Sequence, residues 1–457
     1  MARIFHTGMA LMVNFYLARK LGPQGFGVLG MASALISYFD VLATLGVPVF
    51  ATRETTQSLH GRKRVAGEMA GVLLLLGMGS YILLLATIPW LGFSRSTQAV
   101  VVIYGIQLMM GPRTFIWAFS AMESLQVPAL ANLIGTFVRM ILVFWLVHGR
   151  QSLTTVAWAT ALGGGVVAAI QMGVYLHRYG VDWQFKLTLT LRIIRSSLAM
   201  AASSIMVRIY GSLDTMVLVY LSTMSAVGEF TAARKLFWVL IGFVDVYSQM
   251  LLPALVHARS AGNEVVMELA ARWLKALATL LMPVAVGGTL VSTSLMVALF
   301  GPAYAPSGPV MAGMVWAVVC AGFGMHFGTL LTALNGERRL ARATTVGVLL
   351  NLVANVALIP RFGPVAAAWV IAFTEFVVCL MAIRAVWTTQ RTVGWPAVDL
   401  SVMVGTGGMA LTIGIHVFTN IWLTIGIAVG IYFVIWASWR RNRQILQRGW
   451  QRLVIKP

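Results

Sequence analysis

Long apolar runs recur along the whole chain, and this feature limits the fold more than any other. Of the 457 residues, 59% are hydrophobic and only 10% are charged, and the mean hydropathy is +0.85. Helical runs of about 18 residues or more match the thickness of a bilayer. A membrane barrel would instead show short alternating strands. The sequence therefore predicts an all-α polytopic membrane protein.

The apolar runs predict about fourteen transmembrane spans joined by short connections. The predicted spans are 4–20, 26–50, 67–92, 97–120, 128–148, 153–177, 196–220, 227–254, 271–299, 309–333, 343–360, 364–385, 397–418 and 420–438. Lys and Arg residues at the ends of spans are counted here with the adjoining connection. If the N-terminus is cytoplasmic, twenty-three of the 33 then fall on the cytoplasmic side, five fall outside and five lie deeper within spans. Cytoplasmic loops collect Lys and Arg, so this bias predicts that both termini are cytoplasmic. The same bias accounts for the net charge of +20 without a nucleic-acid partner.

A weak internal repeat divides the chain into two similar halves. An aspartate followed eight residues later by a proline occurs in each half, at Asp40 and at Asp245. The stretches 156–158 and 367–369 form a second match, in the same order and at nearly the same shift. The repeat predicts two six-helix lobes with parallel orientation, as in transporters whose substrate site lies between the halves.

The repeat and the span count together predict four parts of the chain. They are an N-lobe at 1–180 with helices 1–6, a C-lobe at 190–390 with helices 7–12, two extra helices at 397–438, and a basic cytoplasmic tail at 439–457.

Charged residues inside the predicted spans are the candidates for function. Each costs about 2.5–3.5 kcal/mol at a helix centre, so a partner charge or a water-filled cavity has to compensate it. The basic ones are Arg113, Arg139, Arg208, Arg234 and Lys235, and the acidic ones are Asp40, Asp214, Asp245 and Glu375.

Two interpretations of these charges remain open. The basic set could form a cationic cavity for an anionic headgroup, because an Arg fork fits phosphate oxygens. It could instead pair with the acids across helices. The acids could in turn bind a coupling proton or sodium ion, and Asp40 is the best case because three hydroxyl side chains share its helical face. Arg234, Trp238 and Asp245 also share one face, which we expect to line any cavity between the lobes.

Motifs for soluble-type catalysis are missing from the sequence. It contains no paired carboxylates in a soluble loop, no HExxH, no nucleophile elbow and no sizeable extramembrane domain. We therefore expect a protein that is not an enzyme, with no catalytic residues, no metal site and no cofactor apart from a coupling H+ or Na+.

Five segments resemble one known family. They are LARKLGPQGFGVLGMASALISYFDVLATLGVPVFATRE, YGSLDTMVLVYLSTMSAVGEFTAARKLFWVLI, FGPAYAPSGPVM, ALNGERRLARAT and IPRFGPVAAAWV. They are similar to O-antigen and polysaccharide flippases, the polysaccharide transporter branch of the multidrug/oligosaccharidyl-lipid/polysaccharide exporter superfamily. The resemblance spans nearly the whole chain. It also implies more residues before the first helix than this chain has.

The resemblance implies a function, a location and a set of site residues. Such proteins move undecaprenyl-diphosphate-linked oligosaccharides from the inner to the outer leaflet of a bacterial or archaeal cytoplasmic membrane by alternating access. They carry a cationic central cavity and can work with other polysaccharide-assembly membrane proteins. Carried onto this chain, the resemblance assigns the diphosphate and acidic sugars to Arg19, Arg53, Arg139, Arg208, Arg234 and Lys235.

Two other functions compete with this one. A cation-coupled multidrug exporter would share the fold, but a pump for cationic drugs should have an acidic, aromatic cavity. A membrane-embedded glycan polymerase or glycosyltransferase usually needs a long loop with catalytic groups, whereas the predicted outer loops are short.

Overall fold

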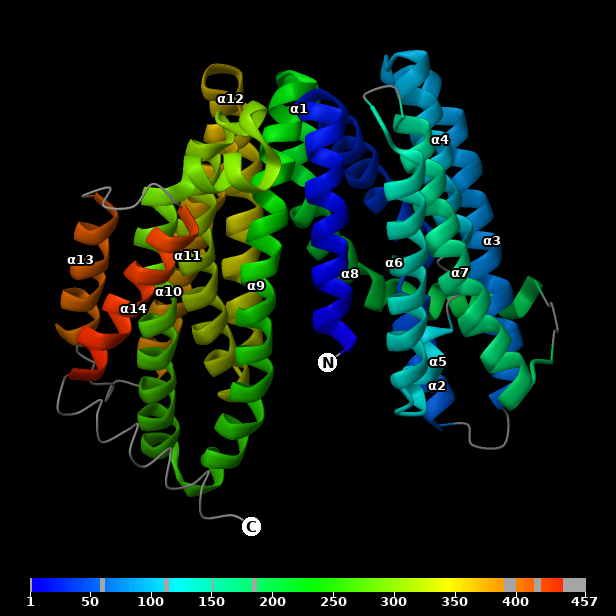
Figure 1. The fold of residues 1–457 in the computed structure, drawn as a ribbon. Helices are drawn as coiled ribbons and strands as arrows, with labels where there is room; N and C mark the ends of the chain where they lie inside the picture. The colour runs from blue at the N-terminus through cyan, green and yellow to red at the C-terminus, as the bar shows by residue number, and fades with distance from the viewer. Residues whose placement is uncertain are drawn as a thin grey trace, which may run out of the picture. The chain divides into compact units, whose positions relative to one another are not determined.

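A computed structural model describes residues 2–57, 62–110, 115–149, 152–182, 187–389, 400–414 and 421–438, and these are almost entirely helical (Figure 1). Within them, nine helices are long and apolar enough to cross a membrane, and two of these helices each contain two predicted spans. The prediction of an all-α polytopic membrane protein is confirmed. The chain forms two compact units, 1–231 and 232–457. The predicted lobe boundaries stay a prediction, and the predicted tail at 439–457 lies outside the described residues.

Unit 1 contains eight helices and the first turns of a ninth. They are α1 (Ala2–Thr44), α2 (Val47–Gln57), α3 (Arg62–Thr87), α4 (Arg95–Met110), α5 (Ile116–Ala121), α6 (Gln126–Leu146), α7 (Leu153–Tyr179), α8 (Leu187–Leu221) and α9 (Met224–Ala258), with the short 3-10 helix Ile88–Leu91 after α3. Among its described residues, unit 2 contains two 3-10 helices, Arg259–Ala261 and Pro302–Tyr304, the rest of α9 and five further α-helices. These are α10 (Asn263–Phe300), α11 (Ser307–Ala333), α12 (Glu337–Thr389), α13 (Leu400–Gly414) and α14 (Ile421–Ser438).

Two of the predicted connections are kinks rather than loops. In α1 the kink lies at Gly22, which has φ 69°, and in α12 it lies at Gly363, which has φ 58°. A proline follows each glycine, and glycine tolerates this left-handed backbone while proline fits the first turn of the next helical segment. The glycine and the proline of the sequence LGPQGFG thus account for the kink in α1.

The second predicted span ends earlier than residue 50, where the sequence placed its end. Helix α1 stops at Thr44, because Leu45 and Gly46 have φ values of 40° and 74°. Pro48 then lies in the first turn of α2, where its missing N–H costs no helical hydrogen bond. The matching proline of the repeat, Pro253, lies inside the continuous helix α9. The two halves of the sequence repeat therefore differ in backbone conformation around Pro48 and Pro253.

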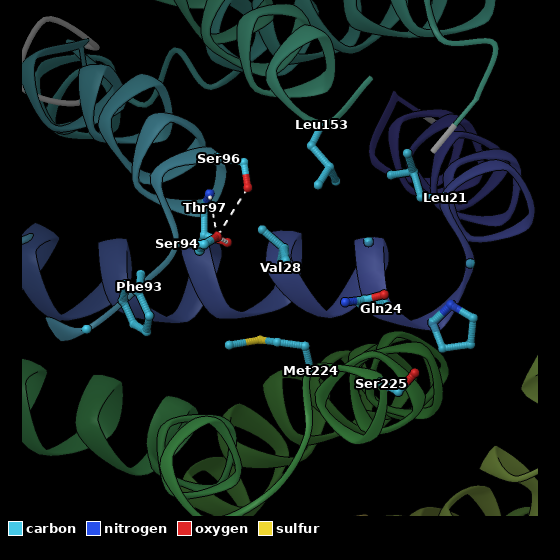
Figure 2. A pocket seen from close by; sticks show the side chains of 14 residues that line it. Leu21, Gln24, Val28, Phe93, Ser94, Ser96, Thr97, Leu153, Met224 and Ser225 are labelled. Atoms are coloured by element: carbon cyan, nitrogen blue, oxygen red, sulfur yellow. Dashed lines mark hydrogen bonds between the residues drawn. The ribbon is translucent and has the colours of Figure 1, made fainter. Parts of the chain in front are cut away.

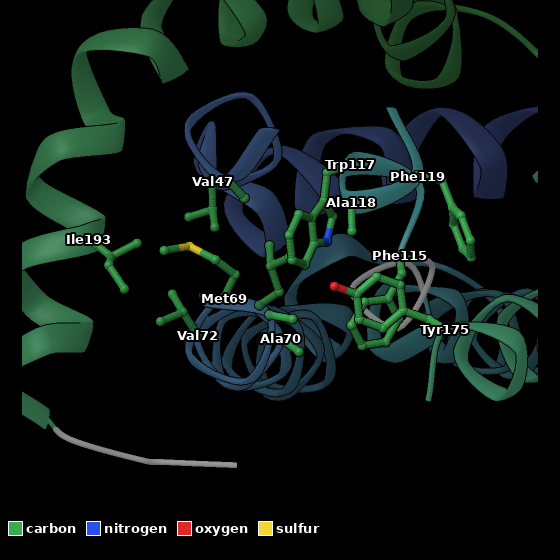
Figure 3. Close-up of a cluster of buried hydrophobic side chains, with 13 residues drawn as sticks. Val47, Met69, Ala70, Val72, Phe115, Trp117, Ala118, Phe119, Tyr175 and Ile193 are labelled. Atoms are coloured by element: carbon green, nitrogen blue, oxygen red, sulfur yellow. The ribbon is translucent and has the colours of Figure 1, made fainter. Parts of the chain in front are cut away.

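Each unit has an apolar core where several helix ends meet. In unit 1, side chains from α2, α3, α5, α7 and α8 form the cluster in Figure 3. The Phe115 and Tyr175 rings stack with centroids 4.5 Å apart, and Phe119 meets Tyr175 edge to face. In unit 2 a comparable cluster joins the end of α9, the start of α10 and the ends of α11 and α12. The unit 2 core joins α9 and α12, the helices that carry Asp245 and Glu375.

Helices α1 and α9 approach closely within unit 1, and glycines make this approach possible. A Cβ at Gly228 would collide with the carbonyl oxygen of Pro23 and lie 3.0 Å from the nitrogen of Gly27. A Cβ at Gly27 would collide with the carbonyl oxygen of Met224. Only residues without a side chain allow two helix backbones to come this near, as at small-residue contacts between membrane helices.

The C-terminal helices attach to α10 through a proline. Pro283 lies inside α10 and has no N–H to donate to the carbonyl of Thr279, four residues earlier. The Tyr432 hydroxyl on α14 donates to that carbonyl at 2.7 Å, and Tyr432 is only 3% exposed. The hydrogen bond therefore satisfies the carbonyl that the proline leaves open and joins α14 to the unit.

Replacing Tyr432 with phenylalanine should lower stability by about 1–3 kcal/mol, because it leaves this carbonyl unsatisfied at a buried contact. Thermal unfolding of the purified protein in detergent measures the effect. Tyr220→Phe is the control, since Tyr220 is 60% exposed. Equal melting temperatures for the two variants would contradict the assigned role of the Tyr432 hydroxyl.

Candidate functional site

The structure places the six basic candidates in different surroundings. Arg19 and Arg53 are exposed, whereas Arg139, Arg234 and Lys235 are half-buried. Arg208 belongs to α8, but its side chain lies outside the described residues, as does all of Arg113. The first four basic candidates belong to unit 1, and Arg234 and Lys235 belong to unit 2. The grouping of all six around one cavity stays a prediction.

Arg139 is held against α7 by two glycines. A Cβ at Gly135 would lie 2.7 Å from the carbonyl oxygen of Gly163, and a Cβ at Gly163 would lie 3.0 Å from the Cβ of Arg139. Helices α6 and α7 therefore pack backbone to backbone beside the base of the Arg139 side chain. A side chain at Gly163 would prevent this close helix packing.

The guanidinium of Arg139 has an unmet hydrogen-bonding capacity. Its Nε is buried and has no hydrogen-bond partner among the described residues. On α1, His6 lies close enough for its imidazole to interact electrostatically with Arg139. A guanidinium with an N–H that no protein group accepts favours an anionic acceptor beside it. The sequence did not single out His6, because one histidine near the N-terminus carries no spacing signal.

Asp40 and the three hydroxyl residues that were predicted to share its helical face all lie on α1. The structure shows the hydrogen bonds of two of these hydroxyl groups. The Ser37 hydroxyl lies 2.7 Å from the Ser212 hydroxyl of α8, and the Thr44 hydroxyl donates to the backbone carbonyl of Asp40 at 2.8 Å. The first contact joins the helix that carries Asp40 to the helix that carries Asp214. Asp40 is half-buried, while Asp214 is only 5% exposed and is the most buried of the four acids.

In unit 2 the predicted face of α9 has a mixed environment. Arg234 and Asp245 are half-buried and Trp238 is 50% exposed, while Ile241 between them is buried. The Trp238 ring packs edge to face on Phe237, with centroids 5.4 Å apart. Whether this face lines a cavity between the lobes stays a prediction.

Sequence reasoning missed a buried polar group on α12. Asn351 and Asn355 are almost fully buried, and the Asn355 amide donates to the Asn351 side-chain oxygen at 3.0 Å. The Asn351 nitrogen has no partner among the described residues. The spacing of four in an apolar span is the signal that would have found this pair. Glu375, the fourth acidic candidate, is half-buried on the second segment of the same helix.

A second missed contact lies where α9 meets α11. The Tyr247 hydroxyl and the His326 Nδ1 lie 2.7 Å apart, and His326 is 1% exposed. The two side chains come from distant parts of the sequence, so no local pattern could pair them. Within the described residues there is no group of three or more His, Cys, Asp or Glu that could hold a metal ion.

Comparisons with known proteins agree on one family. The family described as polysaccharide biosynthesis protein matches residues 1–259. The "Putative O-antigen transporter" of Escherichia coli strain K12 is 22% identical over 54% of this chain and 60% of its own length. The "Probable flippase AglR" of Haloferax volcanii is 22% identical over 90% of this chain and 87% of its own length.

A solved structure shows the same fold. The lipid II flippase MurJ in its inward closed conformation matches with a TM-score of 0.78, covering 96% of this chain and 98% of that protein. The sequence identity is 14%, so this likeness concerns the fold alone. The relatives are named as a transporter and a flippase rather than as enzymes.

Proposed function

The chain belongs to the polysaccharide biosynthesis protein family, and from this premise we propose that it flips an undecaprenyl-diphosphate-linked oligosaccharide across a membrane. The substrate would pass from the cytoplasmic to the outer leaflet by alternating access, for the synthesis of surface polysaccharide. The protein acts in this proposal as a transporter and not as an enzyme. The family, the two named relatives and the shared fold support a membrane flippase.

One observation carries the substrate assignment. Arg139 extends from an apolar helix, and its Nε is buried without a partner among the described residues. A buried N–H of a charged group that lacks a hydrogen-bond acceptor is costly, and a diphosphate supplies both the negative charge and the acceptor oxygens. Arg234 and Lys235, half-buried in unit 2, would contribute further positive charge. Arg19, Arg53 and Arg208 complete the proposed set.

The acidic residues are proposed to couple transport to an ion. Asp40, Asp214, Asp245 and Glu375 lie on helices that cross the membrane in this proposal, and a carboxylate there can bind H+ or Na+. Asp214 is the first choice because it is the most buried of the four. A mid-membrane carboxylate that takes up a cation on one side and releases it on the other can supply energy for the cycle.

The membrane and the orientation follow from the same proposal. The chain is a multi-pass membrane protein. We place it in the cytoplasmic membrane, as the resemblance implies, with both termini inside, because the Lys and Arg bias favours that orientation. Its partners would be the lipid-linked oligosaccharide, the bilayer and other membrane proteins of polysaccharide assembly.

Deleting the gene tests this function. We expect the lipid-linked oligosaccharide to accumulate on the cytoplasmic leaflet and surface polysaccharide to be lost, and the plasmid-borne gene to restore both. Mass spectrometry of extracted lipids, with and without enzymatic oxidation of exposed sugars, measures the leaflet. Normal surface polysaccharide with altered drug susceptibility would instead support a multidrug exporter. Turnover of the lipid-linked substrate into a new product by the purified protein would support an enzyme.

A further inference from the structure

A cavity of about 550 Å³ lies within unit 1, where four helical segments begin (Figure 2). The segments are the second part of α1 after the Gly22 kink, α4, α7 and α9. These segments belong to the even-numbered predicted spans, so their first residues all lie on the predicted outer side. The volume is in the range of small-molecule binding sites. None of the proposed cation-binding or ion-coupling residues lines this cavity.

The lining of the cavity is neutral and mixed in chemistry. Of its fourteen described lining residues, none carries a charge. Hydroxyl and amide side chains come from three separate elements, and the apolar side chains of Phe93 and Met224 lie among them. The lining residues themselves offer no counter-charge to a charged group such as a phosphate. A sugar ring fits this combination, because it offers hydroxyls to polar groups and C–H faces to apolar ones.

Two of the polar groups are available to a ligand. The Gln24 amide and the Ser225 hydroxyl have no hydrogen-bond partner among the described residues, and both line the cavity. Ser96 is exposed and bonds only to Ser94, at 3.1 Å. Figure 2 shows these three side chains around one space. An amide offers two donors and an acceptor, and a hydroxyl can donate or accept, which suits the hydroxyls of a saccharide.

The walls of the cavity are fixed by internal contacts. The Ser94 hydroxyl donates to the Thr97 hydroxyl at 2.9 Å, and the Gln98 amide donates to the Phe93 carbonyl at 2.9 Å. On the other side, the glycine contact between α1 and α9 places Gln24 and Ser225 at a set separation. A site that is formed before the ligand arrives loses less conformational entropy on binding.

From these observations we propose that the cavity binds an uncharged sugar of the glycan on the outer side of the membrane. The assignment of the glycan as ligand rests on the proposed flippase function. In the cycle, the sugar part would engage Gln24, Ser96 and Ser225 after the diphosphate has left the cationic residues. The cavity would then hold the hydrophilic end of the product until the next assembly enzyme takes it.

The test measures protection of an introduced thiol. Ser96→Cys in the full-length protein is labelled with a membrane-impermeant maleimide in intact cells and in detergent. The native Cys320 and Cys379 are half-buried and buried, and the wild type measures their background labelling. The probe is the free neutral oligosaccharide released by mild acid from the cell's own lipid-linked glycan. We expect it to slow labelling at least fivefold at saturation, while a galacturonate trimer does not.

Two further variants define the site. Gln24→Leu and Ser225→Ala are each combined with Ser96→Cys. Each should raise the oligosaccharide concentration needed for half-maximal protection about five- to tenfold, as expected for one lost hydrogen bond. Ser222 lies three residues before Ser225 and does not line the cavity. Ser222→Ala is therefore the control and should leave the protection unchanged. Melting temperatures show that each variant is folded.

Five results would contradict part of the proposal or the proposed function. No protection of a folded, labelled Ser96→Cys protein would overturn the proposal, and so would equal protection by the galacturonate trimer or protection that survives both lining substitutions. Lack of labelling in intact cells, with labelling in inverted vesicles, would overturn the outer location. If deletion of the gene leaves glycan export intact while the oligosaccharide still protects, the proposed function fails and the sugar site stands.

Discussion

Replacing Arg139 with alanine is expected to reduce export of the surface polysaccharide about ten- to hundredfold. The substitution removes from α6 a half-buried arginine whose Nε is buried without a hydrogen-bond partner among the described residues. A lost hydrogen bond to a charged group is worth about 1.5–3 kcal/mol, which corresponds to that range of affinity. Quantifying surface glycan by immunoblot, at matched amounts of membrane-inserted protein, measures the effect.

Two companion variants separate the charge of Arg139 from its packing. Arg139→Met keeps most of the side-chain length beside Gly163 but removes the charge, so it should be as defective as the alanine variant. Arg139→Lys keeps the charge without the planar fork and should be intermediate. Arg272→Ala is the control, because Arg272 is highly exposed and bonds only to Glu268, four residues earlier on α10. Full export by Arg139→Met would show that the residue acts through packing alone.

Replacing Gly228 with alanine should destabilise the protein strongly. The new Cβ would collide with the carbonyl oxygen of Pro23 in α1, and a backbone atom cannot rotate away as a side-chain end can. Overpacking typically costs about 1–3 kcal/mol, and a backbone clash belongs at or above the upper end. We expect a fall of about 5 °C or more in melting temperature, with lower yield of monodisperse protein.

A second glycine on the same helix provides the matched control. Gly242 of α9 has nothing within 4 Å of the position that a Cβ would take. Gly242→Ala should therefore be neutral or slightly stabilising, since alanine is favoured over glycine in a helix by about 1 kcal/mol. Opposite signs for the two substitutions would confirm the close contact of α1 and α9. Equal effects would contradict it.

The sequence predicts the structure best where the local structure of a segment depends on that segment alone. The apolar runs predict the helices, because the transfer of about 18–20 apolar residues into lipid dominates the energy of each segment. The kink at Gly22 was predictable in the same way, since Gly and Pro act on their own backbone. The early end of the second span at Thr44 was missed, because Leu45 adopts a positive φ that leucine does not signal.

The candidate site was predictable only in part. The charges in apolar helices are visible in the sequence, so Arg139 and Asp214 stand out from residue type and position alone. The surroundings of these residues cannot be predicted from the sequence. The exposure of Arg19 and Arg53, the burial of the Arg139 Nε and the presence of His6 nearby depend on which helices are neighbours.

The sequence alone determined the membrane class, the approximate spans and the residue types available for recognition. Each of these depends on local transfer energy and local backbone preference, which a short stretch expresses without reference to the rest of the chain. Only the tertiary structure decided that Gly27 meets Gly228, that Ser37 meets Ser212 and that Tyr432 completes α10 at Pro283. Such contacts join residues about 150 to 200 positions apart, and they form where helix packing brings complementary shapes and hydrogen-bonding groups together.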